Sequence, residues 1–343
     1  MPHKKLALLG FGNVGQALAE LLLRKKDELE TIYDLTYSIT AIATGSHGAA
    51  INPDRIDSQK ALTLIRAGGS LDELSVSPPP SDRHEFIRAS GADVLFENTP
   101  VSYADGQPAL DHIRTALENG MYAITANKGP VVHGYRELTQ LAAEKGRKFY
   151  FESTVMDGAP IFSMFREALP AAQVTAFKGI LNSTTNLILS RMEAGESYSE
   201  ALAYAQSVGI AETDPSGDVD GWDAAIKVSA LATVLMDTPL KPQEVDRTGI
   251  QEITPEHMAE AQAAGKRWKL MCSAQKDEGK VTARVAPEMV GPETPFYTVE
   301  GTTSIVEFES DVLGNLSILE TDPGPETTAY GLLADFINAV TKS

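Results

Sequence analysis

The chain has 343 residues, of which 43% are hydrophobic and 22% are charged, a composition typical of a folded globular protein. This length exceeds that of an ordinary single domain, so we expect two domains. The formal net charge of −18 and the lack of any Lys/Arg cluster exclude a nucleic-acid-binding surface, because the chain would repel a phosphate backbone.

Cysteine content and hydropathy bear on the compartment. Cys272 is the only cysteine, so no internal disulfide can form. The opening MPHKKLALLG begins like a signal peptide, but its apolar run stops at Gly10 and no cleavage site follows. No segment approaches the roughly 18 apolar residues of a membrane span. We therefore expect a cytoplasmic protein that binds neither membranes nor nucleic acids.

Strands alternate with helices through the first part of the chain. The residue patterns predict strands over 5–9, 37–44, 92–97, 121–126 and 148–153, and helices over 16–26, 109–118 and after Pro130. Such alternation is typical of βαβ units with a mostly parallel sheet. We assign residues 1–150 to an α/β domain of this kind.

A glycine-rich turn joins the first predicted strand to the first predicted helix, with the sequence Gly10-Phe11-Gly12-Asn13-Val14-Gly15. The spacing G-x-G-x-x-G is a weak signal alone, but between a strand and a helix it predicts the dinucleotide-binding loop of a Rossmann domain. Gly10 would permit the tight turn, Gly12 would let the backbone approach a pyrophosphate, and Gly15 would let the helix pack on the strand. The N-terminus of the helix would attract the phosphate charge.

The end of the second predicted strand bears on the choice of dinucleotide. NAD sites usually carry an acid there, which accepts a hydrogen bond from the ribose 2′-hydroxyl. This chain has Thr44, Gly45, Ser46 and His47 instead. A 2′-phosphate is then not repelled, and Ser46, His47 or the nearby Lys60 could contact it. No arginine stands at this point of the sequence. We predict that NADP is preferred, while NAD stays compatible with a neutral pocket.

Residues 151–320 show a different pattern, which predicts an α+β domain. A hydroxyl-rich turn covers 179–186, and a helix follows to about Glu193. Ser197 and Glu200 form a capping box for a helix that ends at Gly209. Further patterns predict a helix over 222–236, strands within 296–319 and a last helix over 328–340. We expect the C-terminal segment 321–343 to pack back on the nucleotide domain.

The helix over 222–236 carries an unusual pair of charges. Asp223 and Lys227 are its only charged residues, and their spacing of four places them on one face. One interpretation is a structural ion pair on a helix surface, but a helix that is apolar nearly all round is typical of burial. A buried ammonium is held by carboxylates, here Asp223, Asp218 or Glu212, or loses its proton more readily. We favour a site lysine.

A second lysine follows a predicted strand end in the segment Thr125-Ala126-Asn127-Lys128-Gly129-Pro130. Ligands of open α/β sheets bind beyond the carboxyl ends of the strands, so Lys128 is placed where a ligand is expected. The alternative interpretation is a solvated loop lysine.

The chain resembles the homoserine dehydrogenases over nearly its full length. The resemblance rests on six motifs in order: GFGNVG (10–15), ENTP (97–100), TANKGP (125–130), ESTV (152–155), GILNSTTNLIL (179–189) and GIAETDPSGDVDGWDAAIK (209–227). It implies a Rossmann domain, a substrate domain that also forms a homodimer, and NAD(P)-dependent interconversion of L-aspartate 4-semialdehyde and L-homoserine. This reaction belongs to threonine and methionine biosynthesis. We expect the short form of the family, without a C-terminal regulatory domain.

The resemblance also implies roles for individual residues. Lys227 and Lys128 would be the catalytic lysines, and Thr99 would contact the cofactor. The residues that would hold the substrate and its ammonium group are Glu212, Asp218, Asp223, Thr184 and Ser183. The positions that match a monovalent cation site in relatives, for Na⁺ or K⁺ held largely by backbone oxygens, are Glu152, Val155, Asp157 and Ala159.

The expected chemistry follows from charge. Hydride arriving at an aldehyde carbon builds negative charge on the carbonyl oxygen, which a positioned ammonium stabilises and protonates. The chain departs from the usual family pattern near the substrate motifs, at Ser183, Ile210, Asp157 and the segment 323–326. Two alternatives therefore stay open. One is a dehydrogenase for another small hydroxy acid or semialdehyde, and the other is a non-catalytic nucleotide-binding sensor.

Overall fold

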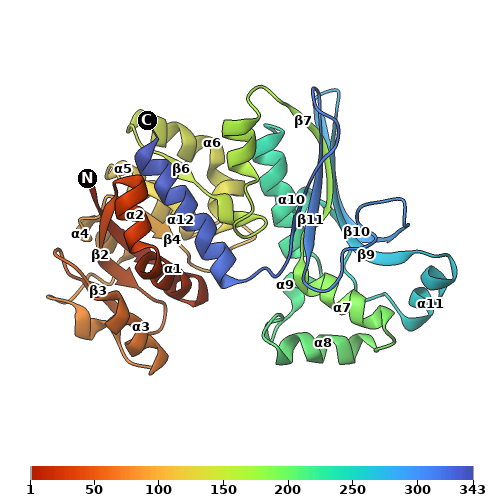
Figure 1. Ribbon diagram of the computed structural model, residues 1–343, viewed down its shortest axis with the longest axis horizontal. Helices are drawn as coiled ribbons and strands as arrows, with labels where there is room; N and C mark the ends of the chain where they lie inside the picture. The colour runs from red at the N-terminus through yellow and green to blue at the C-terminus, as the bar shows by residue number, and fades with distance from the viewer. Residues whose placement is uncertain (1, 343) are drawn as a thin grey trace. The chain divides into compact units, whose positions relative to one another are not determined.

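The computed structural model describes residues 2–342, and the chain divides into two compact units, most of whose elements are labelled in Figure 1. Unit 1 comprises Met1–Pro160 and Gly324–Ser343, and unit 2 comprises Ile161–Pro323. Unit 2 is therefore an insertion in the sequence of unit 1.

Unit 1 is built around a six-stranded sheet in the order β3-β2-β1-β4-β5-β6. Its strands are β1 (His3–Leu9), β2 (Thr36–Ala43), β3 (Ala49–Ile51), β4 (Val94–Glu97), β5 (Tyr122–Thr125) and β6 (Phe149–Tyr150). All neighbours pair in parallel except β3, which is antiparallel to β2. The strand order reverses at β1, which is the doubly wound arrangement of a dinucleotide-binding fold. The predicted Rossmann domain is confirmed.

Helices cover both faces of this sheet. They are α1 (Asn13–Arg24), α2 (Lys26–Tyr33), α3 (Ser58–Arg66), α4 (Arg83–Ala89), α5 (Ala109–Glu118), α6 (Lys128–Glu144) and α12 (Pro325–Thr341). Side chains alternate along β1, so Leu6 and Leu8 enter one core while Ala7 and Leu9 enter the other. A strand that is apolar on both faces is typical of a parallel sheet covered twice.

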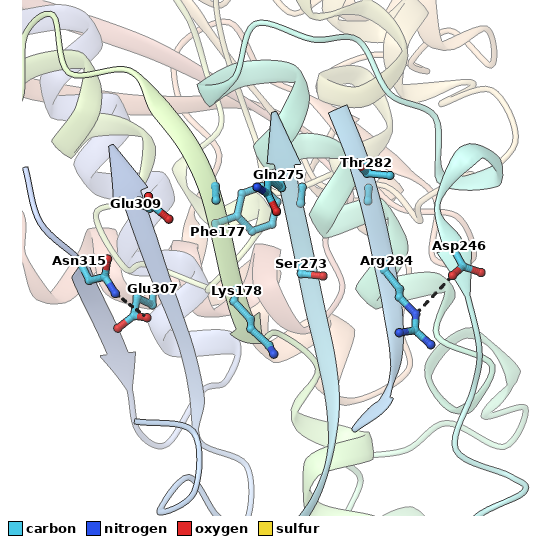
Figure 2. A pocket seen from close by; sticks show the side chains of 13 residues that line it. Phe177, Lys178, Asp246, Ser273, Gln275, Thr282, Arg284, Glu307, Glu309 and Asn315 are labelled. Atoms are coloured by element: carbon cyan, nitrogen blue, oxygen red, sulfur yellow. Dashed lines mark hydrogen bonds and ion pairs between the residues drawn. The ribbon is translucent and has the colours of Figure 1, made fainter. Parts of the chain in front are cut away.

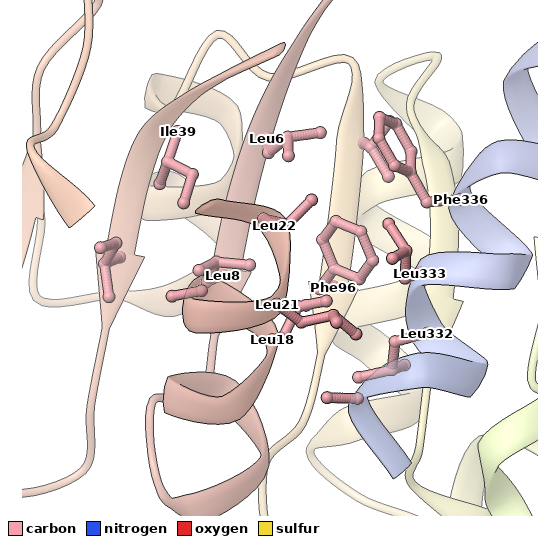
Figure 3. Packing of buried hydrophobic residues seen from close by; sticks show 14 of the residues in the cluster. Leu6, Leu8, Leu18, Leu21, Leu22, Ile39, Phe96, Leu332, Leu333 and Phe336 are labelled. Carbon is pink, nitrogen blue, oxygen red and sulfur yellow. The ribbon is translucent and has the colours of Figure 1, made fainter. Parts of the chain in front are cut away.

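The helix α12 follows the insertion in the sequence and completes the core of unit 1. Leu332, Leu333 and Phe336 lie in one apolar cluster with Leu18 of α1 (Figure 3). The rings of Phe96 in β4 and Phe336 pack edge to face with their centroids 5.9 Å apart. The C-terminal helix is therefore an integral part of the nucleotide unit.

Unit 2 is an α+β unit around a second sheet, in the order β12-β11-β7-β9-β10-β8. Its strands are β7 (Val174–Ile180), β8 (Asp246–Arg247), β9 (Arg267–Asp277), β10 (Lys280–Val290), β11 (Ser304–Ser310) and β12 (Leu316–Glu320). Its helices are α7 (Ser183–Glu193), α8 (Tyr198–Ser207), α9 (Ser216–Val219), α10 (Trp222–Leu235) and α11 (Pro255–Ala263). The helix α10 packs against β9 and β10.

Two predictions for unit 2 need correction, and one hairpin was not predicted. The hydroxyl-rich segment is not a turn, because Asn182 caps α7 and its side chain accepts a hydrogen bond from Thr185 N–H, so the helix begins at Ser183. Strand structure begins at Ser304 rather than near 296. The long hairpin of β9 and β10 was missed, since its turn uses Glu278 and Gly279, both with positive φ, in place of the usual Asn-Gly or Asp-Gly signal.

The predicted capping box of α8 is confirmed: Ser197 and Glu200 bond each other's backbone N–H groups. Within residues 2–342 the structure contains no helix with the length and apolar character needed to cross a bilayer.

Candidate active site

The glycine-rich loop between β1 and α1 combines close packing with open space. Gly10 has φ +94°, and a Cβ atom there would lie 2.4 Å from the carbonyl oxygen of Asn98. A Cβ atom on Gly15 would lie 2.4 Å from the carbonyl oxygen of Gly10. At Gly12, in contrast, no described atom lies within 4 Å of the Cβ position. Packing therefore requires glycine at 10 and 15, whereas Gly12 leaves room for a ligand to approach the backbone.

The N-terminus of α1 suits a phosphate group. Gly12 is the N-cap, and no described side chain caps this helix or places an acid in its first turn. The first N–H groups of α1 therefore stay available to an anion. Of the other loop residues, Phe11 is buried, Val14 is half-buried and Asn13 is exposed. The pyrophosphate of a dinucleotide fits this end of the helix.

The ends of β4 and β5 are joined by a buried network that sequence analysis missed. Glu97 is fully buried, and its carboxylate accepts hydrogen bonds from the hydroxyl of Thr99 and from Thr125 Oγ1, the latter at 3.4 Å. The ring of His112 lies 3.4 Å from the same carboxylate. A buried carboxylate needs such donors. Glu97 therefore fixes Thr99, the predicted cofactor residue.

The same network sets the start of α6. Asn127 Nδ2 donates to the carbonyl oxygen of Thr99 at 2.9 Å, and Asn127 Oδ1 accepts from Gly129 N–H at 2.9 Å as the N-cap of α6. Lys128 is the first residue of that helix and is half-buried. Thr99 and Lys128 thus belong to one hydrogen-bonded edge, at the carboxyl ends of two neighbouring parallel strands.

The basic residue beside the turn that follows β2 is not the one predicted. Although no arginine stands near Thr44–His47 in the sequence, Arg83 of α4 donates from its guanidinium to the carbonyl oxygen of Thr44 at 2.8 Å. Lys60 lies instead in a pocket with Glu73 and Leu74, and no described contact joins it to the turn. The fold therefore supplies the turn with an arginine from 39 residues away.

In unit 2, four side chains meet at the start of α7 and α10 and form what we call the lysine–carboxylate cluster: Asn182, Asp218, Asp223 and Lys227. Lys227 Nζ lies 2.9 Å from Asp223 Oδ2 and donates to the carbonyl oxygen of Leu181 at 2.6 Å. Asn182 Nδ2 donates to Asp218 Oδ1 at 2.7 Å and to Asp223 Oδ2 at 3.0 Å. Only 14% of the Lys227 side chain and 16% of that of Asp223 are exposed, so the pair is not a solvated surface pair.

The carboxyl group of Asp218 has a perturbed pKa. Burial and the nearby charge of Asp223 raise its pKa, while hydrogen bonds from Asn182 and Thr184 and the charge of Lys227 act in the opposite direction. Two carboxylates beside a single ammonium leave negative charge in excess. Such a site is suited to a second cation, for example the ammonium group of an amino acid.

The remaining predicted substrate residues differ in placement. Thr184 is buried in the first turn of α7, and Ser183 is half-buried beside it. Glu212 is exposed in the loop after α8, and no described contact joins its carboxylate to the lysine–carboxylate cluster. Asn182, which organises the cluster, was not predicted. Its signal was present in the sequence, since an asparagine before a hydroxyl-rich helix start is a typical N-cap.

The predicted cation segment has a different role for its aspartate. Asp157 Oδ2 accepts hydrogen bonds from Gly324 N–H at 2.7 Å and from Thr327 Oγ1 at 2.8 Å. Two departures from the family pattern, at Asp157 and at 323–326, therefore contact each other at the start of α12. Within the described residues no group of three or more His, Cys, Asp or Glu side chains could hold a metal ion. Glu152 and Val155 are buried, and Ala159 is half-buried.

Two family models together match nearly the whole chain. Residues 160–337 match the family model for homoserine dehydrogenase, and residues 10–152 match the model for the homoserine dehydrogenase NAD-binding domain. The chain belongs to the homoserine dehydrogenase family.

Individual homoserine dehydrogenases match over almost the whole chain. The chain is 33% identical to an NAD(+)-dependent homoserine dehydrogenase of Pseudomonas canavaninivorans, over 98% of this chain and 96% of that protein. It is 34% identical to a homoserine dehydrogenase of Methanocaldococcus jannaschii, over 97% of each chain. A solved homoserine dehydrogenase structure from Thiobacillus denitrificans superposes with a TM-score of 0.83 at 28% identity, over 99% of this chain and 73% of that one.

Proposed function

We propose that this member of the homoserine dehydrogenase family interconverts L-homoserine and L-aspartate 4-semialdehyde by hydride transfer. The supporting observation is the lysine–carboxylate cluster, because one shielded ammonium beside two carboxylates suits both halves of the substrate. The carboxylates of Asp218 and Asp223 would hold its amino group, and Lys227 would act on its oxygen.

A nicotinamide dinucleotide bound at the glycine-rich loop would supply the hydride. Lys227 Nζ would donate a hydrogen bond and then a proton to the carbonyl oxygen of the aldehyde, where negative charge develops. Asp223, 2.9 Å away, would hold the ammonium in place between turnovers. Asn182 would fix both carboxylates through its amide. In the reverse direction the neutral amine of Lys227 would take the hydroxyl proton of homoserine.

We propose Lys128 as the second catalytic lysine and Thr99 as a cofactor residue, on the basis of the TANKGP and ENTP motifs. The network of Glu97 and Asn127 supports this, since it immobilises both positions at the carboxyl edge of the sheet. Glu212, Thr184 and Ser183 stay proposed substrate residues, with Thr184 supported by its place in the first turn of α7.

The activity is tested by the loss of reduced-nicotinamide absorbance with aspartate semialdehyde and with a panel of other semialdehydes. Turnover of aspartate semialdehyde that disappears in Lys227→Met and persists in Lys241→Met is the expected result. Lys241 is an exposed lysine of the same unit and serves as the matched control. Turnover of other semialdehydes alone would show that the enzyme acts on a different substrate. Nucleotide binding without any turnover would favour a non-catalytic sensor.

We propose NADP as the preferred cofactor, with NAD also compatible. The support is the absence of an acid in the sequence Thr44-Gly45-Ser46-His47, together with the guanidinium of Arg83 beside it. A cytoplasmic location and an amino-acid biosynthetic role are proposed on the same family basis.

A monovalent cation, Na⁺ or K⁺, is proposed for the segment Glu152–Ala159 from the family resemblance. Because the Asp157 carboxylate bonds Gly324 and Thr327, backbone oxygens would have to supply the ligands. The melting temperature in NaCl, KCl and choline chloride at equal ionic strength tests this, and equal values in all three would reject the cation.

We propose a homodimer that forms through one face of the sheet of unit 2. A row of polar side chains crosses this face from strand to strand, in the order Glu307, Lys178, Ser273, Arg284 and Asp246 (Figure 2). They line a shallow pocket of about 410 Å³ that contains none of the predicted site residues. The row has an acid at each end and a base on either side of the neutral Ser273, so a second copy shifted by one strand along the row brings opposite charges into contact.

Light scattering during size-exclusion chromatography measures the mass of the species in solution. Two chains for the native protein and one for Lys178→Glu are expected, because the change places two acids side by side in the row. A monomeric native protein would reject the dimer.

A further inference from the structure

The turn after β2 is tightly organised. Thr44 N–H donates to the carbonyl oxygen of Gly48 at 3.0 Å, and His47 N–H donates to Thr44 Oγ1 at 2.7 Å. The hydroxyl of Ser46 lies 2.8 Å from His47 Nδ1. These bonds leave Gly45 and Ser46 exposed at the tip of the turn, next to the carboxyl end of β2.

Arg83 lies beside this turn as the first residue of α4. Its guanidinium donates to the carbonyl oxygen of Thr44 at 2.8 Å, and its Cζ lies 5.9 Å from the centroid of the Phe86 ring. These two contacts restrain the position of the planar group. A guanidinium carries five N–H donors, and one hydrogen bond leaves most of them available.

The charges around Arg83 do not neutralise it. Across residues 2–342, no carboxylate lies within ion-pair distance of its guanidinium. The preceding Asp82 instead caps α4, where Oδ1 accepts from Glu85 N–H at 2.8 Å. One acid contacts the turn itself, since Asp72 Oδ1 accepts from Ala49 N–H at 2.9 Å, beyond Gly48. The positive charge of Arg83 is therefore not neutralised by an ion pair.

Arg83 lies at the end of the sheet where a dinucleotide-binding fold holds the adenosine ribose. In a dinucleotide-binding fold the carboxyl end of the second strand meets the adenosine ribose, where an acid selects NAD and an arginine accommodates the 2′-phosphate of NADP. The arginine need not follow the strand in sequence, because only its position in space matters. Planar guanidinium groups bind phosphate through two parallel hydrogen bonds.

We infer that Arg83 is the residue that selects NADP, by binding the 2′-phosphate together with the hydroxyl of Ser46 and the ring of His47. This inference rests on the proposed nucleotide-binding function and adds the residue that sets cofactor preference. The hydrogen bond to Thr44 orients the guanidinium before the cofactor arrives, which reduces the entropy lost on binding. Lys60, predicted for the same role, has no described contact with the turn.

A purely structural Arg83, which only ties α4 to the turn, makes a different prediction. Its loss would lower the stability of the fold and would weaken the binding of NADPH and NADH equally, because both cofactors share every group except the 2′-phosphate. The ratio of the two dissociation constants therefore separates the two roles, whatever happens to stability.

The test measures dissociation constants for NADPH and NADH on the full chain, from the fluorescence of the reduced nicotinamide and without substrate. The variants are Arg83→Gln and Arg83→Lys, with Arg88→Gln as the control on the exposed side of the same helix. Arg83→Gln is expected to raise the dissociation constant of NADPH about 10- to 100-fold and to change that of NADH by no more than about twofold. Arg83→Lys should lie between, since it keeps the charge but loses the planar fork.

Competition by adenosine 2′,5′-bisphosphate gives a second measurement, which should succeed on the native chain and fail on Arg83→Gln. Equal losses for both cofactors, no loss, or tighter binding of NADH than of NADPH by the native chain would overturn the inference. Selective loss of NADPH in a chain without homoserine turnover would uphold it while rejecting the proposed substrate.

Discussion

Lys227 Nζ lies 2.9 Å from the carboxylate of Asp223, one helical turn away on α10, and donates in addition to the carbonyl oxygen of Leu181. The ammonium is thus held by one charged and one neutral acceptor, and 14% of the side chain is exposed. This geometry holds the Lys227 amine between two acceptors and nearly shielded from water, which suits the proposed stabilisation of a developing alkoxide.

Removal of that ammonium should abolish turnover and leave the nucleotide site intact. Lys227→Met is expected to lower kcat by about 10²–10⁴-fold, the usual contribution of a positioned acid or oxyanion donor. The dissociation constant of NADPH should not change, because Lys227 belongs to unit 2 and the glycine-rich loop to unit 1. Stopped-flow turnover and fluorescence titration measure the two quantities. A variant that retained native kcat would remove Lys227 from the mechanism.

Asp218→Asn should raise stability while it weakens substrate binding. Because burial and Asp223 raise the pKa of Asp218 in the folded state, the native chain binds this proton more tightly than the unfolded chain. The unfolding free energy then falls as pH rises through that interval, and at neutral pH the buried charge is a net cost.

An amide at 218 removes this cost and can still accept the hydrogen bond from Asn182. The melting temperature at pH 7 is expected to rise by about 2–4 °C, the change that 1 kcal/mol produces in a domain of this size. The KM for the amino-acid substrate should rise in the same variant. A lower melting temperature would mean that the charge of Lys227 outweighs the burial of Asp218.

Lys269 gives the protein an alkaline pH dependence. Its side chain is fully buried on β9, donates to Asn186 Oδ1 and to the carbonyl oxygen of Val299, and burial lowers its pKa to about 8. Below that pH the buried charge destabilises the fold. Between about pH 8 and the unfolded value of about 10.4, the unfolded chain binds more protons, so this group makes the unfolding free energy rise with pH.

Urea unfolding of the native chain and of Lys269→Met across this interval isolates the effect. The difference in unfolding free energy between the two should change with pH in favour of the native chain, because only the native chain is relieved of the buried charge. Parallel pH dependences would show that Lys269 titrates like an exposed lysine.

Asp157 should matter for stability through α12. It has φ +41°, a left-handed conformation that aspartate and asparagine tolerate better than most residues, and its carboxylate bonds Gly324 and Thr327. Asp157→Ala is expected to cost about 1–2 kcal/mol of unfolding free energy, and Asp157→Asn much less. The urea midpoint of each variant measures this. Equal losses in both would indicate that charge, rather than hydrogen bonding, holds the helix start.

Sequence alone predicted what is local. The loop Gly10–Gly15 and the pair Asp223 and Lys227 lie within one turn or one helix, so their spacing determines their geometry. Asn182 and Arg83 could not be placed in the same way, since their partners Asp223 and Thr44 are 41 and 39 residues away and meet them only in the fold. Glu212 shows that closeness in sequence does not ensure contact in the fold. A short distance in sequence to Asp218 did not bring its exposed carboxylate into contact with the cluster.

The insertion of unit 2 within unit 1 also affects how the chain is made. The ribosome completes β1, α1 and β4 early, but α12 emerges only after the whole of Ile161–Pro323 has been synthesised. Until then Leu18 and Phe96 lack the apolar surface of Leu332 and Phe336 that covers them in the finished protein. Until α12 is synthesised, the part of the core that α12 covers stays exposed beside α1, and chaperone binding during translation should concentrate there.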